Sequence, residues 1–255
     1  MARRKQTPPP SLTLGILRGL GRLFLRHAAR VWGWIWHWAR LVLAVFFAAV
    51  VTATLLYIPI NPPTTLLIAA EKARLGSVEW QWVDLEQIAP VMARAAVAAE
   101  DANFCNHWGF DVNAIRQVIA RGESRGASTI TQQTVKNVFL WPARSWPRKA
   151  LEAVITPIVE LFWTKRRILE VYLNVAEFDA GVFGVEAAAR HYFGVSAADL
   201  TAEQAARLAA VLPDPRKRSA SQPSQFVLRR AEAIMDGAET IRADGRAACF
   251  QDQRR

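Results

Sequence analysis

The stretch LVLAVFFAAVVTATLLYIPI, residues 41–60, decides the architecture of this chain. It carries no charged residue, and as an α-helix it would extend about 30 Å, the thickness of the apolar core of a bilayer. A buried core helix is a weaker interpretation, because the stretch is apolar on every side and arginines precede it. A cleaved signal peptide is also weaker, because its apolar core would be shorter and nearer the N-terminus. The sequence therefore predicts one transmembrane helix at residues 41–60.

The flanks of this stretch predict its orientation. Residues 1–40 contain eight Lys and Arg and no acidic residue. Positive flanks stay on the cytoplasmic side, so everything after the span should be exported, to the periplasm in a bacterium with two membranes. We expect a basic cytoplasmic tail and juxtamembrane segment at 1–40, the span at 41–60 and a periplasmic domain at 61–255. Four indole rings before the span suit the headgroup level: Trp32, Trp34, Trp36 and Trp38.

Net charge argues against a nucleic-acid-binding protein. The formal charge of the 255 residues is +10, but residues 41–255 hold 24 basic and 22 acidic side chains, so the excess belongs to the tail. In an oxidising compartment Cys105 and Cys249 either form a disulfide or remain two unrelated small apolar side chains. The sequence leaves both interpretations open.

The exported part is expected to be mainly α, with few strand signals. An Ala-rich run predicts a helix over residues 85–99, and periodic apolar residues predict another over 150–174, kinked near Pro157. Three further helices have N-terminal capping signals. These are Asp111 before Val112, Ile115, Val118 and Ile119; Thr129 with Gln132, towards Phe139; and Thr201 with Gln204, ending before Pro213.

Two glutamates stand out as candidates for chemistry. Glu100 follows the Ala-rich run, and partial burial beside apolar walls would raise its pKa towards neutrality. Glu152 lies one helical turn after Arg148, which Lys149 follows directly, and this pattern suits either a surface ion pair or charge compensation of a diphosphate. The polar residues between the two glutamates suit either a capped surface helix or binding of sugar and phosphate. These are Ser128, Gln132, Gln133, Lys136 and Asn137.

The order of five motifs is more specific than any one of them. They are EDANFCNHWG at 100–109, GASTITQQ at 126–133, RKALE at 148–152, RILEVYLN at 167–174 and GVFGVEAAARHYFG at 181–194. This set resembles the peptidoglycan glycosyltransferases, glycosyltransferase family 51, over residues 91–215. Within the family, FLWP at 139–142 and the lack of any Ser-x-x-Lys resemble the monofunctional biosynthetic type without a transpeptidase domain.

The resemblance implies a lysozyme-like helical domain with a small membrane-facing jaw subdomain. It implies polymerisation of lipid II into β-1,4 glycan strands, with loss of undecaprenyl diphosphate, at the bacterial inner membrane. Glu100 resembles the general base, and Glu152 the second glutamate, which would assist the diphosphate with a divalent cation, Mg²⁺ or Mn²⁺. Lys136, Arg148 and Lys149 would bind phosphates. Ser128, Gln132, Gln133 and Asn137 would line the donor cleft.

The resemblance also implies partners: lipid II, the growing glycan strand, the membrane and other proteins of cell-wall synthesis. Three departures from the family pattern are Val195, where Lys is frequent, Asp179-Ala180 in a stretch that is usually richer in glycine, and Cys105.

Two alternatives remain open at this point. One is a lysozyme-like lytic enzyme, which would need no basic groups around a second glutamate, since no diphosphate leaves. The other is a catalytically inactive membrane scaffold, which would not need both carboxylates.

Overall fold

The computed structural model of the chain describes residues 12–120, 122, 128–143 and 145–251. The chain divides into two compact units, residues 1–51 and 52–255. The expected tail at 1–11 lies outside the described residues. The first unit consists of most of one long helix, and the second unit contains all the other elements.

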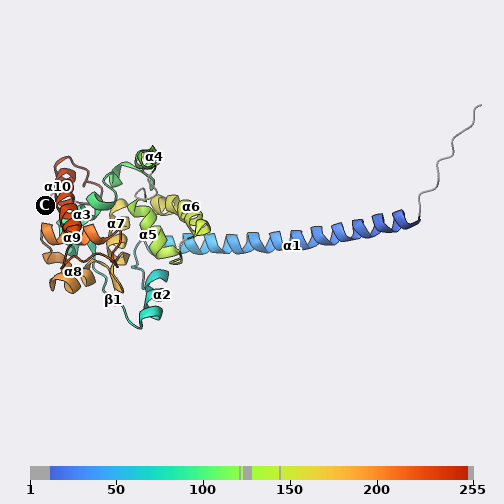
Figure 1. Cartoon of the computed structure of the whole chain (residues 1–255), viewed down its shortest axis with the longest axis horizontal. Coiled ribbons are helices and arrows are strands. Elements are labelled where there is room, and N and C mark those ends of the chain that lie inside the picture. The colour runs from blue at the N-terminus through green and yellow to red at the C-terminus, as the bar shows by residue number, and fades with distance from the viewer. Residues whose placement is uncertain (1–11, 121, 123–127, 144, 252–255) are drawn as a thin grey trace, which may run out of the picture. The chain divides into compact units, whose positions relative to one another are not determined.

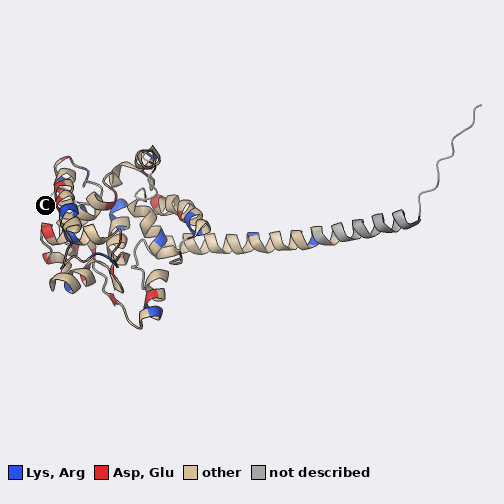
Figure 2. Ribbon diagram, viewed as in Figure 1, with Lys and Arg blue, Asp and Glu red and all other residues tan. Residues whose placement is uncertain are grey.

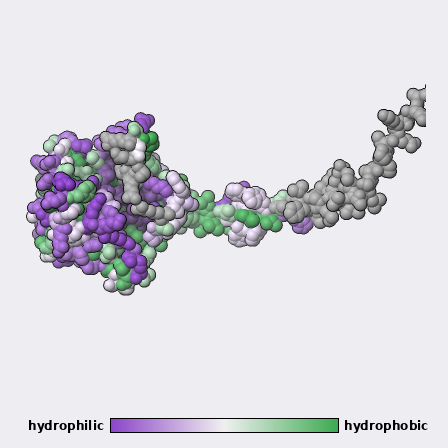
Figure 3. All heavy atoms as spheres, viewed as in Figure 1, coloured by the Kyte–Doolittle hydropathy of each residue, from purple (hydrophilic) through white to green (hydrophobic). Residues whose placement is uncertain are grey.

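The long helix α1 (Leu12–Leu56) includes a stretch that could cross a membrane, Ala29–Leu56. Among the described residues it is the one helix that is long and apolar enough. Only 11% of its most apolar part is buried, which disfavours a core helix. Figure 2 shows no charged residue in the last part of α1, and Figure 3 shows hydrophobic surface there.

α1 begins well before the predicted span of residues 41–60, and it ends four residues before the end of that span. Its last regular residue is Leu56, and the chain continues in turns with hydrogen bonds from Ile58 N to Leu55 O and from Ile60 N to Leu56 O. Pro59 explains the earlier end, because it has no N–H to continue the helical ladder.

The second unit is mainly helical, which confirms the predicted fold class (Figure 1). Among the described residues, three short 3₁₀ turns connect its helices: Leu85–Gln87, Phe104–Asn106 and Ala197–Asp199. The α-helices are α2 (Leu66–Leu75), α3 (Pro90–Glu100), α4 (Val112–Ala120), α5 (Ile130–Phe139), α6 (Trp146–Phe162), α7 (Lys165–Val175), α8 (Val185–Phe193), α9 (Ala202–Val211) and α10 (Gln225–Ala243).

A small sheet accompanies these helices. It has the strand order β1-β3-β2, with β1 (Glu79–Trp80), β2 (Glu177–Asp179) and β3 (Val182–Phe183). β1 pairs parallel with β3, and β2 pairs antiparallel with β3 across an irregularity. Strands of two or three residues are too short to show the alternation that identifies a strand in a sequence.

The helix expected at residues 85–99 begins later than predicted. Residues Leu85–Gln87 form a 3₁₀ turn capped by Asp84, and α3 starts only at Pro90. Proline disfavours the helical conformation of the residue before it, so Ala89 stays extended and separates the two elements. The helix also continues one residue further, to Glu100.

The helix expected at residues 150–174 is two helices. α6 continues past Pro157 to Phe162, and the break comes at Trp163 and Thr164. The Thr164 side chain accepts a hydrogen bond from Arg167 N and caps α7. The periodic spacing of apolar residues continues across this break, so the sequence predicted one helix. In the structure the N-cap residue Thr164 starts a second helix.

The three capped helices are present where they were predicted. Thr129 with Gln132 and Thr201 with Gln204 form capping boxes, and Asp111 Oδ1 accepts from Ala114 N at 2.8 Å. The apolar face of α4 is nevertheless not packed. None of its residues is buried, and Ile119 is 72% exposed.

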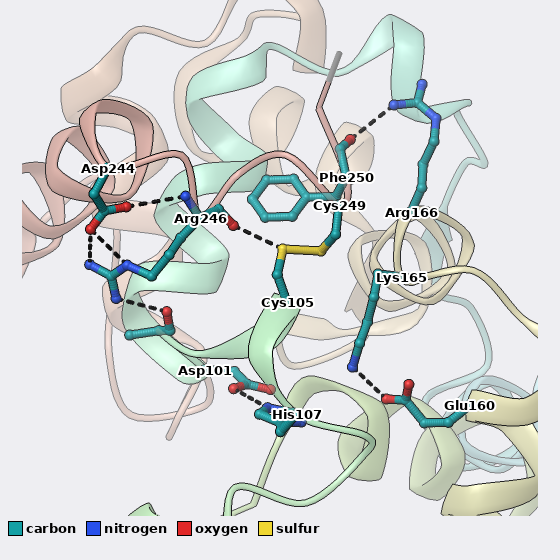
Figure 4. The surroundings of a disulfide bond; sticks show 11 residues. Asp101, Cys105, His107, Glu160, Lys165, Arg166, Asp244, Arg246, Cys249 and Phe250 are labelled. Atoms are coloured by element: carbon teal, nitrogen blue, oxygen red, sulfur yellow. Dashed lines mark hydrogen bonds and ion pairs between the residues drawn. A yellow bond between two sulfur atoms is a disulfide. The ribbon is translucent and has the colours of Figure 1, made fainter. Parts of the chain in front are cut away.

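The core of the second unit forms where two groups of helices pack. α3, α9 and α10 pack against one another, and α5 packs against α6 and α7. Cys105 and Cys249, 144 residues apart, are joined by a disulfide that ties the loop after α3 to the segment after α10 (Figure 4). Of the two interpretations that the sequence left open, the structure has the disulfide.

Candidate active site

Glu100 is the last residue of α3, and its side chain is only 11% exposed. Gln133, on the second turn of α5, donates from Nε2 to Glu100 Oε2 at 2.8 Å. The other oxygen, Oε1, is buried without a hydrogen-bond partner. Gln133 therefore holds one oxygen of the carboxylate, and the other oxygen makes no hydrogen bond.

The surroundings of Glu100 tune it as a base. Burial raises its pKa, while the Gln133 hydrogen bond and the charges of Arg230, Lys136 and Arg218 partly oppose this rise. Arg230 Nη2 lies 3.8 Å from Glu100 Oε1, beyond hydrogen-bond distance. A carboxyl group with a raised pKa is a stronger base, and it can take a proton close to neutral pH.

Asp101 has a separate role from Glu100 although the two are neighbours. Its Oδ2 accepts from Ile130 N, the first residue of α5, at 3.0 Å. Its Oδ1 lies 2.7 Å from His107 Nε2, and the two side chains meet in Figure 4. A carboxylate at a helix N-terminus is stabilised by the free N–H groups there. Asp101 thus fixes the start of the helix that supplies Gln133 and Lys136.

Glu152 is buried on α6, with its side chain 3% exposed. Its carboxylate pairs with Lys149, whose Nζ also donates to Ser128 Oγ at 3.2 Å. The sequence suggested Arg148 as a partner one turn away, but the structure pairs Glu152 with Lys149. Glu152, Lys149 and Ser128 therefore form one cluster, which joins the start of α6 to the residue before the Thr129 cap.

Lys136 links the two glutamates electrostatically. Burial lowers its pKa, Glu152 and Glu100 oppose this shift, and Arg148 and Lys149 add to it. The ammonium group of Lys136 therefore lies in the field of both carboxylates and of two other cations.

A cleft of about 440 Å³ opens beside this cluster. Four of the predicted site residues line it: Gln133, Lys136, Asn137 and Arg148. The others do not: Glu100, Ser128, Gln132, Lys149 and Glu152. Gln132 is instead occupied by its capping box, where its Oε1 accepts from Thr129 N at 3.1 Å. The cleft wall is completed by Leu67, Glu71, Trp141, Pro142, Tyr172, Ala176, Glu177, Leu212, Pro213, Asp214, Pro215 and Arg216.

The wall supplied by the C-terminal half was not predicted. Arg216 binds Glu177 through both carboxylate oxygens, at 2.9 and 3.1 Å from Nη2, and reaches Glu71 of α2 at 2.9 Å. Arg230 of α10, beside Glu100, was missed too. These pairs are far apart in sequence, so no local pattern could have revealed them.

The chain is similar to known proteins over most of its length. A family model described as Transglycosylase matches residues 69–239. A biosynthetic peptidoglycan transglycosylase from Jannaschia sp. (strain CCS1) is 66% identical over 194 residues, covering 76% of this chain and 81% of that protein. A protein of the same name from Caulobacter vibrioides is 46% identical over 216 residues, covering 82% of this chain and 94% of that protein.

Proposed function

This chain belongs to the transglycosylase family and is a peptidoglycan glycosyltransferase, and we propose that it polymerises lipid II into β-1,4 glycan strands. A hydroxyl of the acceptor sugar attacks the anomeric carbon of the donor. The bond from that carbon to the lipid diphosphate breaks with inversion, and undecaprenyl diphosphate leaves. Peptide cross-linking is not part of the proposal, because no Ser-x-x-Lys motif occurs in the sequence.

The observation that carries the proposal is the state of Glu100. A sugar hydroxyl is a weak nucleophile until a base takes its proton during attack. Glu100 is buried, has a raised pKa and is held through Oε2 by Gln133, while Oε1 makes no hydrogen bond and lies 3.8 Å from Arg230 Nη2. We propose that Oε1 takes the proton of the attacking hydroxyl group. The Glu100 carboxylate is then ionised before the attack and neutral after it.

The departing diphosphate needs positive charge, which the described residues supply around the cleft. Lys136 of α5 and Arg148 of α6 line the cleft, and Lys149 follows Arg148 on α6. Fixed cations favour a transition state in which negative charge gathers on the leaving group. Glu152 holds Lys149 in place, which supports a positioning role for the second glutamate.

A divalent cation does not fit as a resident group in this site. The described residues contain no cluster of three or more His, Cys, Asp or Glu that could hold a metal ion. Glu71, Glu177 and Asp214 line the cleft, and each is paired with Arg216 or Lys217. Glu152 is buried and paired with Lys149. Mg²⁺ is commonly bound by one or two carboxylates together with substrate phosphates. We therefore assign charge compensation to the lysines and Arg148, and any Mg²⁺ or Mn²⁺ to the substrate diphosphate.

The proposed substrate explains the membrane helix. Lipid II is held in a bilayer by its own lipid, so an enzyme anchored by α1 meets it on one surface. We propose that the chain spans the inner membrane once, with residues 1–40 cytoplasmic and the catalytic unit periplasmic. The exposed apolar residues of α4, Val112 and Ile119, support α4 as the membrane-facing jaw.

The proposal is tested by supplying the full chain with purified lipid II and, separately, with finished peptidoglycan. We expect long glycan strands from lipid II and no soluble fragments from the finished wall. Release of fragments from the wall without polymer from lipid II would identify a lytic enzyme instead. Neither product, from a correctly folded protein, would favour an inactive scaffold.

A further inference from the structure

Trp141 is an accessible indole in the wall of the cleft. It follows α5 and the C-cap residue Leu140, and it is 36% exposed. Within the described residues its Nε1 makes no hydrogen bond, and its ring stacks on no aromatic ring or cation. Trp163, in contrast, is 4% exposed and donates from Nε1 to Thr54 O at 2.7 Å. Trp141 therefore presents a large aromatic ring that no described aromatic ring or cation covers.

Two neutral amides line the same cleft on the helix that precedes Trp141. Gln133 and Asn137 are one turn apart on α5, about 6 Å along its axis. Asn137 is 5% exposed, and its side-chain amide makes no hydrogen bond with any described residue. Gln133 donates from Nε2 to Glu100, while its Oε1 has no partner in the described part of the chain. An amide both donates and accepts, so this pair suits the hydroxyl groups of a ligand.

An indole beside two amides suits a sugar ring better than a phosphate or a lipid chain. The face of an aromatic ring carries partial negative charge, so it repels a phosphate and attracts C–H groups. A sugar ring has C–H groups on its faces and hydroxyl groups around its edge, so it can contact the indole and the amides together. A lipid chain fits less well, because hydrocarbon over Asp214 and Arg216 of the same wall would remove water from charged groups.

We propose that Trp141 stacks on a sugar ring of lipid II whose hydroxyl groups bind Gln133 and Asn137. The inference rests on the proposed function and refines it, because it divides the cleft between two parts of the substrate. The sugar ring lies on Trp141, and the diphosphate lies at Lys136 and Arg148. Stacking forms when the substrate binds and persists in the transition state, so it lowers KM and leaves kcat nearly unchanged.

Trp141→Leu and Trp141→Phe in the full chain test the inference, because leucine keeps an apolar side chain and phenylalanine also keeps an aromatic face. With lipid II in detergent we expect KM to rise about tenfold in Trp141→Leu and at most about threefold in Trp141→Phe. In both variants kcat should stay within about twofold of wild type. The soluble disaccharide of the glycan strand, which has no lipid or diphosphate, should inhibit Trp141→Leu about tenfold more weakly than wild type.

Trp146→Leu is the matched control, since Trp146 is 88% exposed at the start of α6 and is not part of the cleft wall. It should keep the wild-type KM and the wild-type inhibition by the disaccharide. A wild-type KM in Trp141→Leu would overturn the inference, and so would a disaccharide that acts equally on wild type and Trp141→Leu. An equal rise of KM in Trp141→Leu and Trp141→Phe would overturn it in favour of the lipid chain.

The thermal midpoint separates binding from packing. It should be the same in wild type and Trp141→Leu, because Trp141 is exposed and makes no internal hydrogen bond with a described residue. A raised KM together with a lower midpoint would identify a packing role and overturn the inference as well. Absence of polymer from the wild type and from Trp146→Leu would instead overturn the proposed function itself.

Discussion

Gln133 donates its side-chain amide to Oε2 of Glu100 across 2.8 Å, and this bond joins α5 to the last residue of α3. The sequence suggested that Gln133 contacts the substrate. The structure gives it a second partner, the carboxylate assigned as the base. The bond fixes the rotamer of Glu100 and favours its ionised form.

Gln133→Met should move the acidic limb of the pH–rate profile to higher pH. The rate depends on ionised Glu100, so it rises with pH through the pKa of this carboxyl group. The amide lowers that pKa, and its removal therefore raises it further. Steady-state polymerisation rates over a range of pH measure the shift, with exposed Gln222→Met as the control. A limb that stays in place or moves to lower pH contradicts this role.

Arg230→Gln should shift the same limb in the same direction. Arg230 Nη2 is 3.8 Å from Glu100 Oε1, and its charge lowers the pKa of Glu100. The matched control is Arg229→Gln, which removes the same charge from the exposed neighbouring position on α10. Equal pH profiles for the two variants would show that Arg230 has no specific effect on Glu100.

The disulfide should stabilise the catalytic unit. It closes a segment of 144 residues, and loss of a native disulfide typically costs about 2–5 kcal/mol. A reducing agent should therefore lower the thermal midpoint of the wild type but not of the Cys105→Ser, Cys249→Ser double variant. An unchanged midpoint in wild-type protein that shows two titratable thiols would contradict this prediction.

The residues at the C-terminal end of the predicted span should stabilise the catalytic unit as well. Trp163 Nε1 donates to Thr54 O at 2.7 Å, and Arg167 donates to Tyr57 O at 3.0 Å and to Ile60 O at 3.1 Å. A variant that starts at Thr52 keeps these bonds, and one that starts at Asn61 loses them. We expect the shorter variant to unfold at a lower temperature. Equal midpoints by calorimetry would show that this segment adds no stability.

Local signals predicted the parts of the fold that local interactions determine. The start of α5 at Thr129 follows from a capping box of four residues. The break at Thr164 was missed because the apolar period runs through it. The sheet was missed because β1 and β3 are each only two residues long and pair across about a hundred residues.

The motifs also supplied candidates for the site, of which Gln133, Lys136, Asn137 and Arg148 line the cleft. Both glutamates and the cations came from the motifs, and the capping box of Gln132 was visible in the sequence. The pairing of Arg230 with Glu100 and of Arg216 with Glu71 depends on long-range packing, so no motif contains it. Tyr172 also lines the cleft, which no motif indicates.

The central claim is that Glu100 is the base that activates the acceptor sugar. The most direct test is the rate of lipid II polymerisation by Glu100→Gln, with exposed Glu232→Gln as the control. We predict a loss of at least about 10²-fold. The midpoint of thermal unfolding should not fall. Because the pKa of Glu100 is raised in the folded protein, ionisation of this carboxyl group lowers the free energy of unfolding as pH rises through that pKa. Polymerisation by Glu100→Gln at the wild-type rate would contradict the account.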